Sequence, residues 1–127
     1  MPAPAALADR AAITALIDAS YLGGLRAGSW ATASRAFHPD AIMYGHVGES
    51  SLTGPAAPNL AAYIANHGPA PRLTAVVDVL DATDSTAVAR VQMEHDAAGA
   101  SFVDLLTLWK GPDGWQIIAK AFATYAP

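Results

Sequence analysis

The order of two kinds of segment along the chain constrains the fold most: helical periodicity in the first half and long β runs in the second. From Arg72 onward, four runs enriched in β-branched residues alternate with short stretches rich in Asp and Gly, which are typical of hairpin turns. The four runs cover residues 73–80, 86–95, 101–110 and 115–125. Helices followed by a four-strand meander predict an α+β domain rather than an alternating βαβ one.

Two helices are predicted at the start of the chain. Apolar or small residues recur at the spacing of one helical face between Ile13 and Leu25, and Gly28 is well placed to end that helix. Ser29 is predicted to cap a short second helix over residues 30–37, because its hydroxyl can accept a backbone N–H of the first turn. The chain therefore begins with a long helix and a short one.

A strand and a third helix are predicted before the β runs. Residues 41–47 have the character of a strand, and residues 48–51 that of a turn. Proline is favoured in the first turn of a helix, so a third helix is expected from Pro55 to the stop at Gly68. Its inner face is predicted to carry Leu60, Ile64 and His67.

The composition narrows the classes of function. A length of 127 residues fits one domain, residues 1–127, and 53% hydrophobic against 14% charged residues predicts apolar surface that faces a cavity or a partner. The net charge of -4 and the scattered basic residues speak against nucleic acid. No apolar stretch is long enough for a membrane span or a secretion signal, so a cytoplasmic protein is expected. Without cysteine, thiolate catalysis and disulfides are excluded.

Period two assigns the side chains of each β run to two faces. In the run of residues 101–110 both faces are apolar, which predicts a central strand covered on both sides. Helices can cover only one side, so a homodimer through the convex face of the sheet is expected. One face carries Phe102, Asp104, Leu106 and Leu108, and the other carries Val103, Leu105, Thr107 and Trp109.

Several short motifs occur in an order that resembles the NTF2-like superfamily, of the SnoaL-like or ketosteroid-isomerase-like type. They are YLGGLRAG at 21–28, Trp30, FHPDA at 37–41, LTGP at 52–55 and DGWQII at 113–118. Within the superfamily, the chain is most similar to the group catalogued as putative lumazine-binding proteins, in Asp104 before Leu-Leu-Thr-Leu and in Lys120-Ala-Phe122. The resemblance implies a cystatin-like cone of three N-terminal helices packed on a curved mixed or antiparallel sheet, around a pocket for a small molecule.

Ketosteroid isomerases are the informative comparison within that superfamily. The resemblance places Tyr21 where their helix tyrosine stands, and Asp104 near the position of their protonated aspartic acid. Their aspartate base falls on Gly45, which cannot take a proton, so the same isomerase chemistry is disfavoured. The superfamily hosts isomerases, cyclases, hydrolases, ligand binders and assembly domains, so the scaffold alone names no reaction.

Three residues are predicted to carry the chemistry. Asp104 lies in an apolar run, where burial would raise its pKa, and it could donate or abstract a proton. Tyr21 is the expected partner, and His95, at the end of the face that includes Val91 and Met93, could act as a base at the pocket mouth. The alternative for each is structural: a hydrogen-bonded aspartate, a core tyrosine and a histidine at an exposed strand end.

Further residues are predicted to form the pocket wall. Alternating alanines in the last run are expected to leave volume inside, unless Tyr63, Trp115 or Tyr125 fills it. The spacing of the four histidines favours no metal site, and no cofactor is expected. Three functions remain open: a small-molecule binder for a carbonyl or heteroaromatic compound, an isomerase, cyclase or dehydratase using Asp104 or His95, and a non-catalytic dimerisation module. The predicted wall residues are Trp30, Met43, Tyr63, His67, Met93, Phe102, Ala119 and Ala123.

Overall fold

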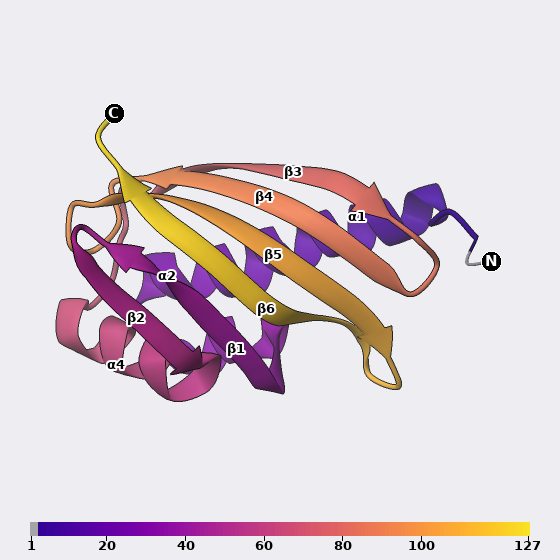
Figure 1. Cartoon of the computed structure of the whole chain (residues 1–127), viewed down its shortest axis with the longest axis horizontal. Coiled ribbons are helices and arrows are strands. Elements are labelled where there is room, and N and C mark those ends of the chain that lie inside the picture. Colours follow the sequence, from indigo (N-terminus) through magenta and orange to yellow (C-terminus); the bar gives the residue numbers. More distant parts are fainter. Residues whose placement is uncertain (1–2) are drawn as a thin grey trace.

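The computed structural model describes residues 3–127 as one six-stranded sheet with helices on one of its faces (Figure 1). The strand order is β2-β1-β6-β5-β4-β3, and all neighbours are antiparallel except β1 and β6, which run parallel. The predicted α+β order, helices before a four-strand meander, is confirmed. The strands are β1 (Phe37–Val47), β2 (Ser50–Pro55), β3 (Thr74–Ala82), β4 (Thr86–Glu94), β5 (Ser101–Gly111) and β6 (Gly114–Tyr125).

The first predicted helix is one continuous rod with an irregular middle. It consists of α1 (Leu7–Leu16), a π-helical segment η1 (Ile17–Leu22) and α2 (Gly23–Ala27). Gly28 ends the rod with a left-handed φ of 67°, which glycine adopts without a steric penalty. No helix among residues 3–127 has the length and apolar character to cross a membrane.

The second helix is shorter than predicted. Ser29 does cap it, because its Oγ accepts the backbone N–H of Thr32 at 3.1 Å. The segment comprises α3 (Trp30–Ala33) and one 3₁₀ turn, η2 (Ser34–Ala36). The prediction that Phe37 belongs to this helix is wrong: Phe37 is extended and pairs with Ile117 as the first residue of β1.

A strand that the sequence analysis did not predict precedes the third helix. After a turn at Gly48, β2 folds back on β1 as a hairpin, in residues that looked like a turn and a helix start. The third helix, α4 (Ala56–His67), begins directly after Pro55 and buries Leu60 and Ile64. The prediction that His67 lies on this inner face is wrong, because His67 is the last residue of α4 and its side chain is exposed.

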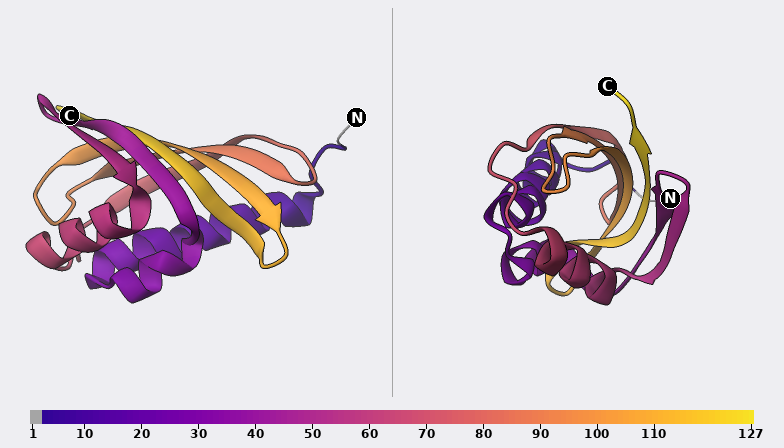
Figure 2. Two further views of the ribbon diagram at one scale, coloured as in Figure 1. Left: turned by 60° about the horizontal axis from the view of Figure 1, so that its bottom comes forward. Right: turned by 90° about the vertical axis from the view of Figure 1, so that its left-hand side faces the viewer.

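The sheet curves strongly, and the helical rod and α4 lie on its concave side (Figure 2). Alternate residues of β4 and β5 point toward the helices and are buried. Together with the helix residues they form one core, which burial of apolar surface stabilises. Its largest apolar members include Ile13, Ile17, Leu22, Met43, Val91, Leu106, Leu108 and Ile117.

A β-bulge in β6 decides which of its side chains face the core. The pairing with β5 passes from Leu108–Ile117 to Thr107–Ala119, so that Ile118 is an extra residue without a partner on β5. One extra residue reverses the alternation of side chains for the rest of a strand. Trp115 and Ile117 are buried before the bulge, and beyond it the buried residues are Lys120 and Phe122.

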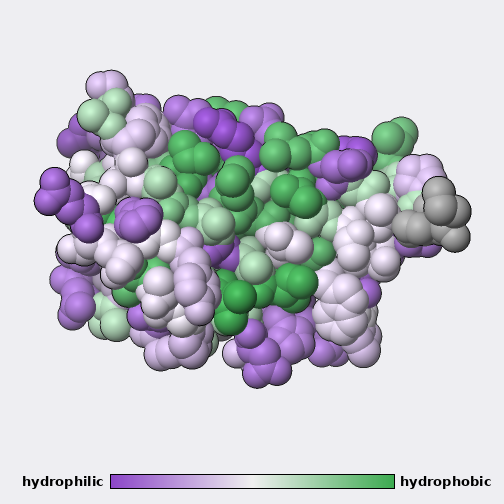
Figure 3. Space-filling model, viewed as in Figure 1, coloured by the Kyte–Doolittle hydropathy of each residue, from purple (hydrophilic) through white to green (hydrophobic). Residues whose placement is uncertain are grey.

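The convex face of the sheet is rich in apolar side chains that remain exposed (Figure 3). Leu105 lies near the middle of that face, 47% exposed, with Ala121 of β6 opposite it. On the other side of Ala121 lies Tyr44 of β1, which is 56% exposed. The other large members of this surface, the outer-face patch, are Ile42, Val76, Leu80 and Val88.

Candidate functional site

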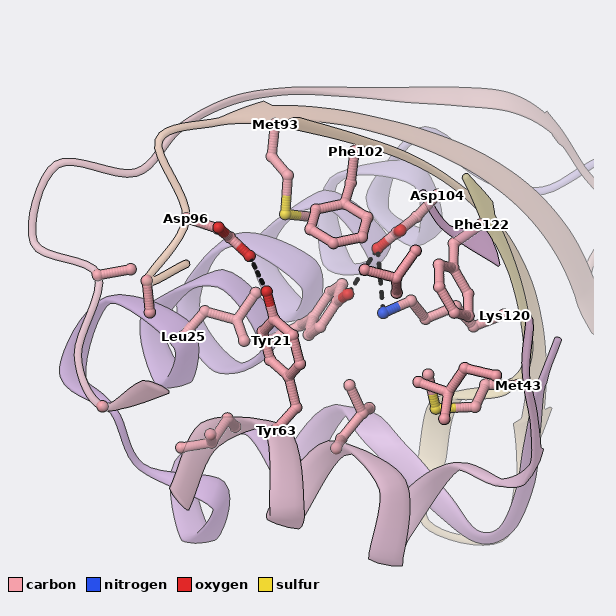
Figure 4. Close-up of a pocket in the computed structure, with 17 residues that line it drawn as sticks. Tyr21, Leu25, Met43, Tyr63, Met93, Asp96, Phe102, Asp104, Lys120 and Phe122 are labelled. Carbon is pink, nitrogen blue, oxygen red and sulfur yellow. Dashed lines mark hydrogen bonds and ion pairs between the residues drawn. The ribbon is translucent and has the colours of Figure 1, made fainter. Parts of the chain in front are cut away.

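A cavity lies between the concave face of the sheet, the helical rod and α4 (Figure 4). Its empty space is about 570 Å³ when the open mouth is included, but only a small part is wide enough to admit a water molecule. Because the cavity is narrow, a ligand of more than a few atoms requires side chains to move. The lining residues are Tyr21, Leu25, Met43, Val47, Leu52, Leu60, Tyr63, Ile64, Gly68, Ala70, Met93, Asp96, Ala97, Phe102, Asp104, Lys120 and Phe122.

Three polar side chains meet inside this apolar wall. The Tyr21 hydroxyl donates a hydrogen bond of 2.5 Å to Oδ2 of Asp104, and the Lys120 Nζ lies 3.7 Å from the same oxygen. Asp104 is fully buried, and its Oδ1 has no hydrogen-bond partner among residues 3–127. A buried carboxylate oxygen without a partner is rare, because a lost hydrogen bond costs free energy in the protein interior. We call these three residues the Tyr21–Asp104–Lys120 cluster.

Two irregular segments position members of the cluster. Tyr21 lies within the π-helical segment η1, and such segments often occur at functional sites. Lys120 faces inward only because the bulge at Ile118 reverses the alternation of β6. Asp104 needs no irregularity, because it shares the inner face of β5 with Phe102 and Leu106.

Burial dominates the electrostatics of the cluster. It raises the pKa of Asp104, although the charge of Lys120 and the hydrogen bond from Tyr21 oppose this shift. Burial likewise lowers the pKa of Lys120, against the opposing charge of Asp104. The pKa of Tyr21 is raised well above its ordinary value, first by burial and then by the Asp104 charge, so the phenol stays protonated. Asp104 and Lys120 thus titrate as a coupled pair in which either can hold a proton.

A second polar contact lies where the cavity adjoins a surface groove, because Asp96 lines both; we call this end of the cavity its mouth. The hydroxyl of Tyr63, on α4, donates a hydrogen bond to Oδ2 of Asp96, in the β4–β5 loop. The other carboxylate oxygen of Asp96 accepts the backbone N–H groups of Ala98 and Ala100 and so orders this loop. Partial burial, followed by the bond to Asp96, raises the pKa of Tyr63. The contact ties α4 to the loop across the entrance.

The structure places most of the predicted site residues in the cavity. Tyr21 and Asp104 meet there, with four of the predicted wall residues. No group of three or more His, Asp or Glu side chains within residues 3–127 is arranged to hold a metal ion. The four wall residues are Met43, Tyr63, Met93 and Phe102.

His95 does not line the cavity itself, and its role as a base at the pocket mouth stays a prediction. Strand β4 ends at Glu94, and His95 has a left-handed φ of 60°, so period two no longer applies to it. Its side chain is exposed and lines a surface groove that shares Ala70, Asp96 and Ala97 with the cavity.

His67 and Trp30, which were predicted as wall residues, do not line the cavity either. The side chain of His67 is exposed, and its ring lies tilted against that of Tyr63, with centroids 4.5 Å apart. Trp30 packs against Phe37.

Ala119 and Ala123 are also wrong as wall residues. Beyond the bulge they lie on the convex side, where Ala119 pairs with Ile42 and Ala123 pairs with His46 of β1. The volume that these alanines leave is therefore on the outside of the sheet.

Gly45, where the base of ketosteroid isomerases would stand, has a steric role in this structure. A Cβ at this position would lie 2.1 Å from the backbone oxygen of Phe122.

Lys120 and Asp96 are the functional candidates that the sequence analysis missed. A signal for Lys120 was present, because it is the one charged residue in the otherwise apolar stretch from Ile117 to Ala123. Strict alternation assigned it to the outside, since a bulge leaves no clear mark in a sequence. Asp96 lies in the predicted turn between residues 95 and 101. No pattern in the sequence indicates that the hydroxyl of Tyr63 donates a hydrogen bond to it.

The fold is that of an NTF2-like protein. The chain is 26% identical to an NTF2-like protein of unknown function from Methylobacillus flagellatus KT, with a TM-score of 0.88 over 99% of this chain and 100% of that one. An NTF2-like protein of unknown function from Shewanella baltica OS155 is 24% identical, with a TM-score of 0.85 over 95% of this chain and 97% of the other. The predicted NTF2-like cone is confirmed.

Residues 8–123 match the family described as "Putative lumazine-binding", and the chain belongs to that family. The family predicted from the sequence is therefore confirmed. A curated relative, "Aldolase FrzH" from a Cladobotryum species, is 29% identical over 105 residues, which are 83% of this chain and 83% of the relative.

Proposed function

We propose that the cavity binds a small organic molecule through a carbonyl group and that the Tyr21–Asp104–Lys120 cluster moves a proton on it. One observation carries this proposal: a fully buried carboxyl group with an unpartnered oxygen, on a residue that lines an apolar cavity. A buried polar atom of this kind favours a role in binding or catalysis over a purely structural one.

The chemistry of the cluster fits a carbonyl ligand. Protonated Tyr21 is a hydrogen-bond donor, and a carbonyl oxygen is an acceptor that gains negative charge when a neighbouring C–H loses its proton. Asp104 can accept that proton, and its raised pKa makes its carboxylate a stronger base than that of an ordinary aspartate. Lys120 supplies a positive charge that stabilises the enolate.

One relative and the family description support this choice of ligand class. The similar Cladobotryum protein is named an aldolase, and an aldol reaction begins with proton loss next to a carbonyl group. The family description names lumazine, a heteroaromatic compound that carries carbonyl groups. Both names point toward carbonyl-bearing organic compounds, which are also what the polar cluster favours.

A thermal-shift screen of ketones, enones and pteridines including lumazine tests the proposal. We expect at least one class to raise the melting temperature of the wild type and to lose most of this effect in Asp104→Asn and Tyr21→Phe. Lys110→Arg is the matched control, because Lys110 lies outside the cavity and pairs with Asp9. The proposal fails if no class stabilises the wild type, or if both cluster variants respond as the wild type does.

Catalysis by isomerase, cyclase or dehydratase chemistry is the finer alternative, with Asp104 as the proton carrier. His95 is not the proton carrier proposed here, because it lines the adjoining surface groove and not the cavity. This alternative requires exchange of an α-proton of a bound ketone with deuterium from the solvent, measured by NMR. Exchange that is equally fast with Asp104→Asn would leave binding as the function.

A purely structural module is disfavoured, because burying three polar side chains in one cavity costs free energy without contributing to such a role.

We also propose that the protein forms a homodimer through the outer-face patch. The patch combines exposed large residues on four strands with the alanine row of β6, which lets a second sheet approach closely. Leu105→Glu is expected to yield monomers in sedimentation velocity. Leu7→Glu is the control, because Leu7 is 86% exposed on α1, away from the sheet face. A monomeric wild type, or a Leu105→Glu variant that stays dimeric, contradicts this proposal.

A further inference from the structure

Lys120 is an unusual lysine for a strand of a small domain. It is only 7% exposed and lines the cavity, whereas lysine side chains almost always keep the ammonium in water. Its Nζ lies 5.3 Å from the ring centroid of Tyr21 and 4.9 Å from that of Phe122. Figure 4 shows the amino group directed toward Asp104 from β6, with the Phe122 ring beside the chain.

The surroundings of this amino group leave its nitrogen available for chemistry. At 3.7 Å, the contact with Asp104 Oδ2 is longer than a hydrogen bond, so it attracts the amine without fixing it. Burial lowers the pKa of Lys120, which increases the fraction of neutral amine at neutral pH. A neutral lysine in an apolar pocket is the form that attacks carbonyl carbons.

We propose that Lys120 is a nucleophile that forms an imine with the carbonyl carbon of a small, uncharged aldehyde or ketone in the cavity. This inference rests on the proposed function, since it requires that a carbonyl compound enters the same site. The largely apolar wall favours uncharged ligands, because moving a charge from water into such a cavity costs free energy. The narrow space favours compounds with a short or flat carbon skeleton.

The steps balance without an oxidant or a reductant. The amine lone pair forms the C–N bond, the carbonyl π electrons move to oxygen, and the oxygen gains a proton from Asp104 in its acid form. The nitrogen then gives up a proton to the Asp104 carboxylate, whose Oδ1 has no other partner. When the hydroxyl group takes that proton and leaves as water, the nitrogen lone pair forms the C=N bond. The products are one water and one protonated imine, which is paired with the Asp104 carboxylate.

The sequence offers an internal control, because Lys110 and Lys120 are its only lysines. Lys110 is 43% exposed, pairs with Asp9 at 2.9 Å and lies outside the cavity. The test incubates the full chain with cyclohexanone or phenylacetaldehyde and adds cyanoborohydride, which reduces an imine to a stable amine. Intact mass and peptide mapping then locate any product, whose mass gain equals that of the probe less one oxygen atom.

We expect a single adduct on the peptide that contains Lys120, formed at least about tenfold faster than any adduct on Lys110, because a buried lysine holds more neutral amine. Lys120→Arg, which keeps the positive charge beside Asp104, should lose the adduct. The wild-type comparison of the two lysines stands even if that variant does not fold. Equal labelling of both lysines refutes the inference. If probes stabilise the wild type through Asp104 but leave Lys120 unlabelled, the imine inference is refuted and the proposed function survives. If no probe stabilises the wild type, both the inference and the proposed function are contradicted.

Discussion

Replacing Lys120 with Met removes the charge that accompanies Asp104 while keeping a side chain of similar length. In the variant, the buried carboxyl group retains only the hydrogen bond from Tyr21. A buried carboxylate that loses its counter-charge typically costs about 3–5 kcal/mol, unless it takes up a proton and becomes neutral. Lys120→Met should therefore destabilise the fold, and the loss should depend on pH.

Protonation of Asp104 sets a ceiling on this loss. Starting from the ordinary pKa of 3.8, neutralising the acid at pH 7 costs about 4.4 kcal/mol, and at pH 5 it costs about 1.6 kcal/mol. The raised pKa means that the folded state holds the proton where the unfolded state has released it, so stability falls as pH rises above 3.8. The cost of Lys120→Met should thus grow from pH 5 to pH 7 by up to about 2.7 kcal/mol.

Urea denaturation of three proteins at pH 5, 6 and 7 measures these values. The proteins are the wild type, Lys120→Met and the double variant Lys120→Met/Asp104→Asn. Asparagine cannot ionise, so the double variant should lose the pH dependence and recover stability at pH 7. A cost that is the same at pH 5 and pH 7, and that asparagine does not relieve, would refute the view that Lys120 compensates a buried acid.

Three further predictions concern residues around the cluster. Tyr21→Phe removes the donor to a buried acid and should lower the free energy of unfolding by about 1.5–3 kcal/mol in urea; a loss below 0.5 kcal/mol would contradict the hydrogen bond. Tyr63→Phe removes the contact with Asp96 at the mouth and should speed association of a stabilising ligand in stopped-flow measurements, with an unchanged rate as the opposing result. Gly45→Ala forces a Cβ against Phe122 and should cost about 1–3 kcal/mol by thermal denaturation; a neutral effect would mean that the strands are not so close.

The fold could be predicted from the sequence because its signals are local and agree with one another. The four β runs and the Asp- and Gly-rich turns between them predict the strands of the meander to within two residues at each end. Ser29 and Gly28 marked helix ends through side-chain capping and a left-handed backbone, both of which depend on residue type alone. Strand β2 was missed because its Gly and Pro residues are disfavoured in strands, and only the pairing with β1 makes it a strand.

The candidate site was predictable only where regular periodicity held. Asp104 and Tyr21 follow the expected faces of β5 and the helical rod, and they meet as the sequence suggested. Lys120 does not, because one extra residue at Ile118 reverses every later side chain of β6. The same bulge moved the alanines from the expected pocket wall to the outer face. His95 does not line the cavity for a related reason, since the strand stops one residue before it.

A crystal structure of the protein with a bound ketone tests the central claim most directly. We expect the carbonyl oxygen within hydrogen-bond distance of Tyr21 or Asp104 and the carbonyl carbon facing the Lys120 amine, inside the cavity. A ketone that binds in the surface groove beside His95 or on the outer-face patch, with the cavity unchanged, would contradict the assignment of the site.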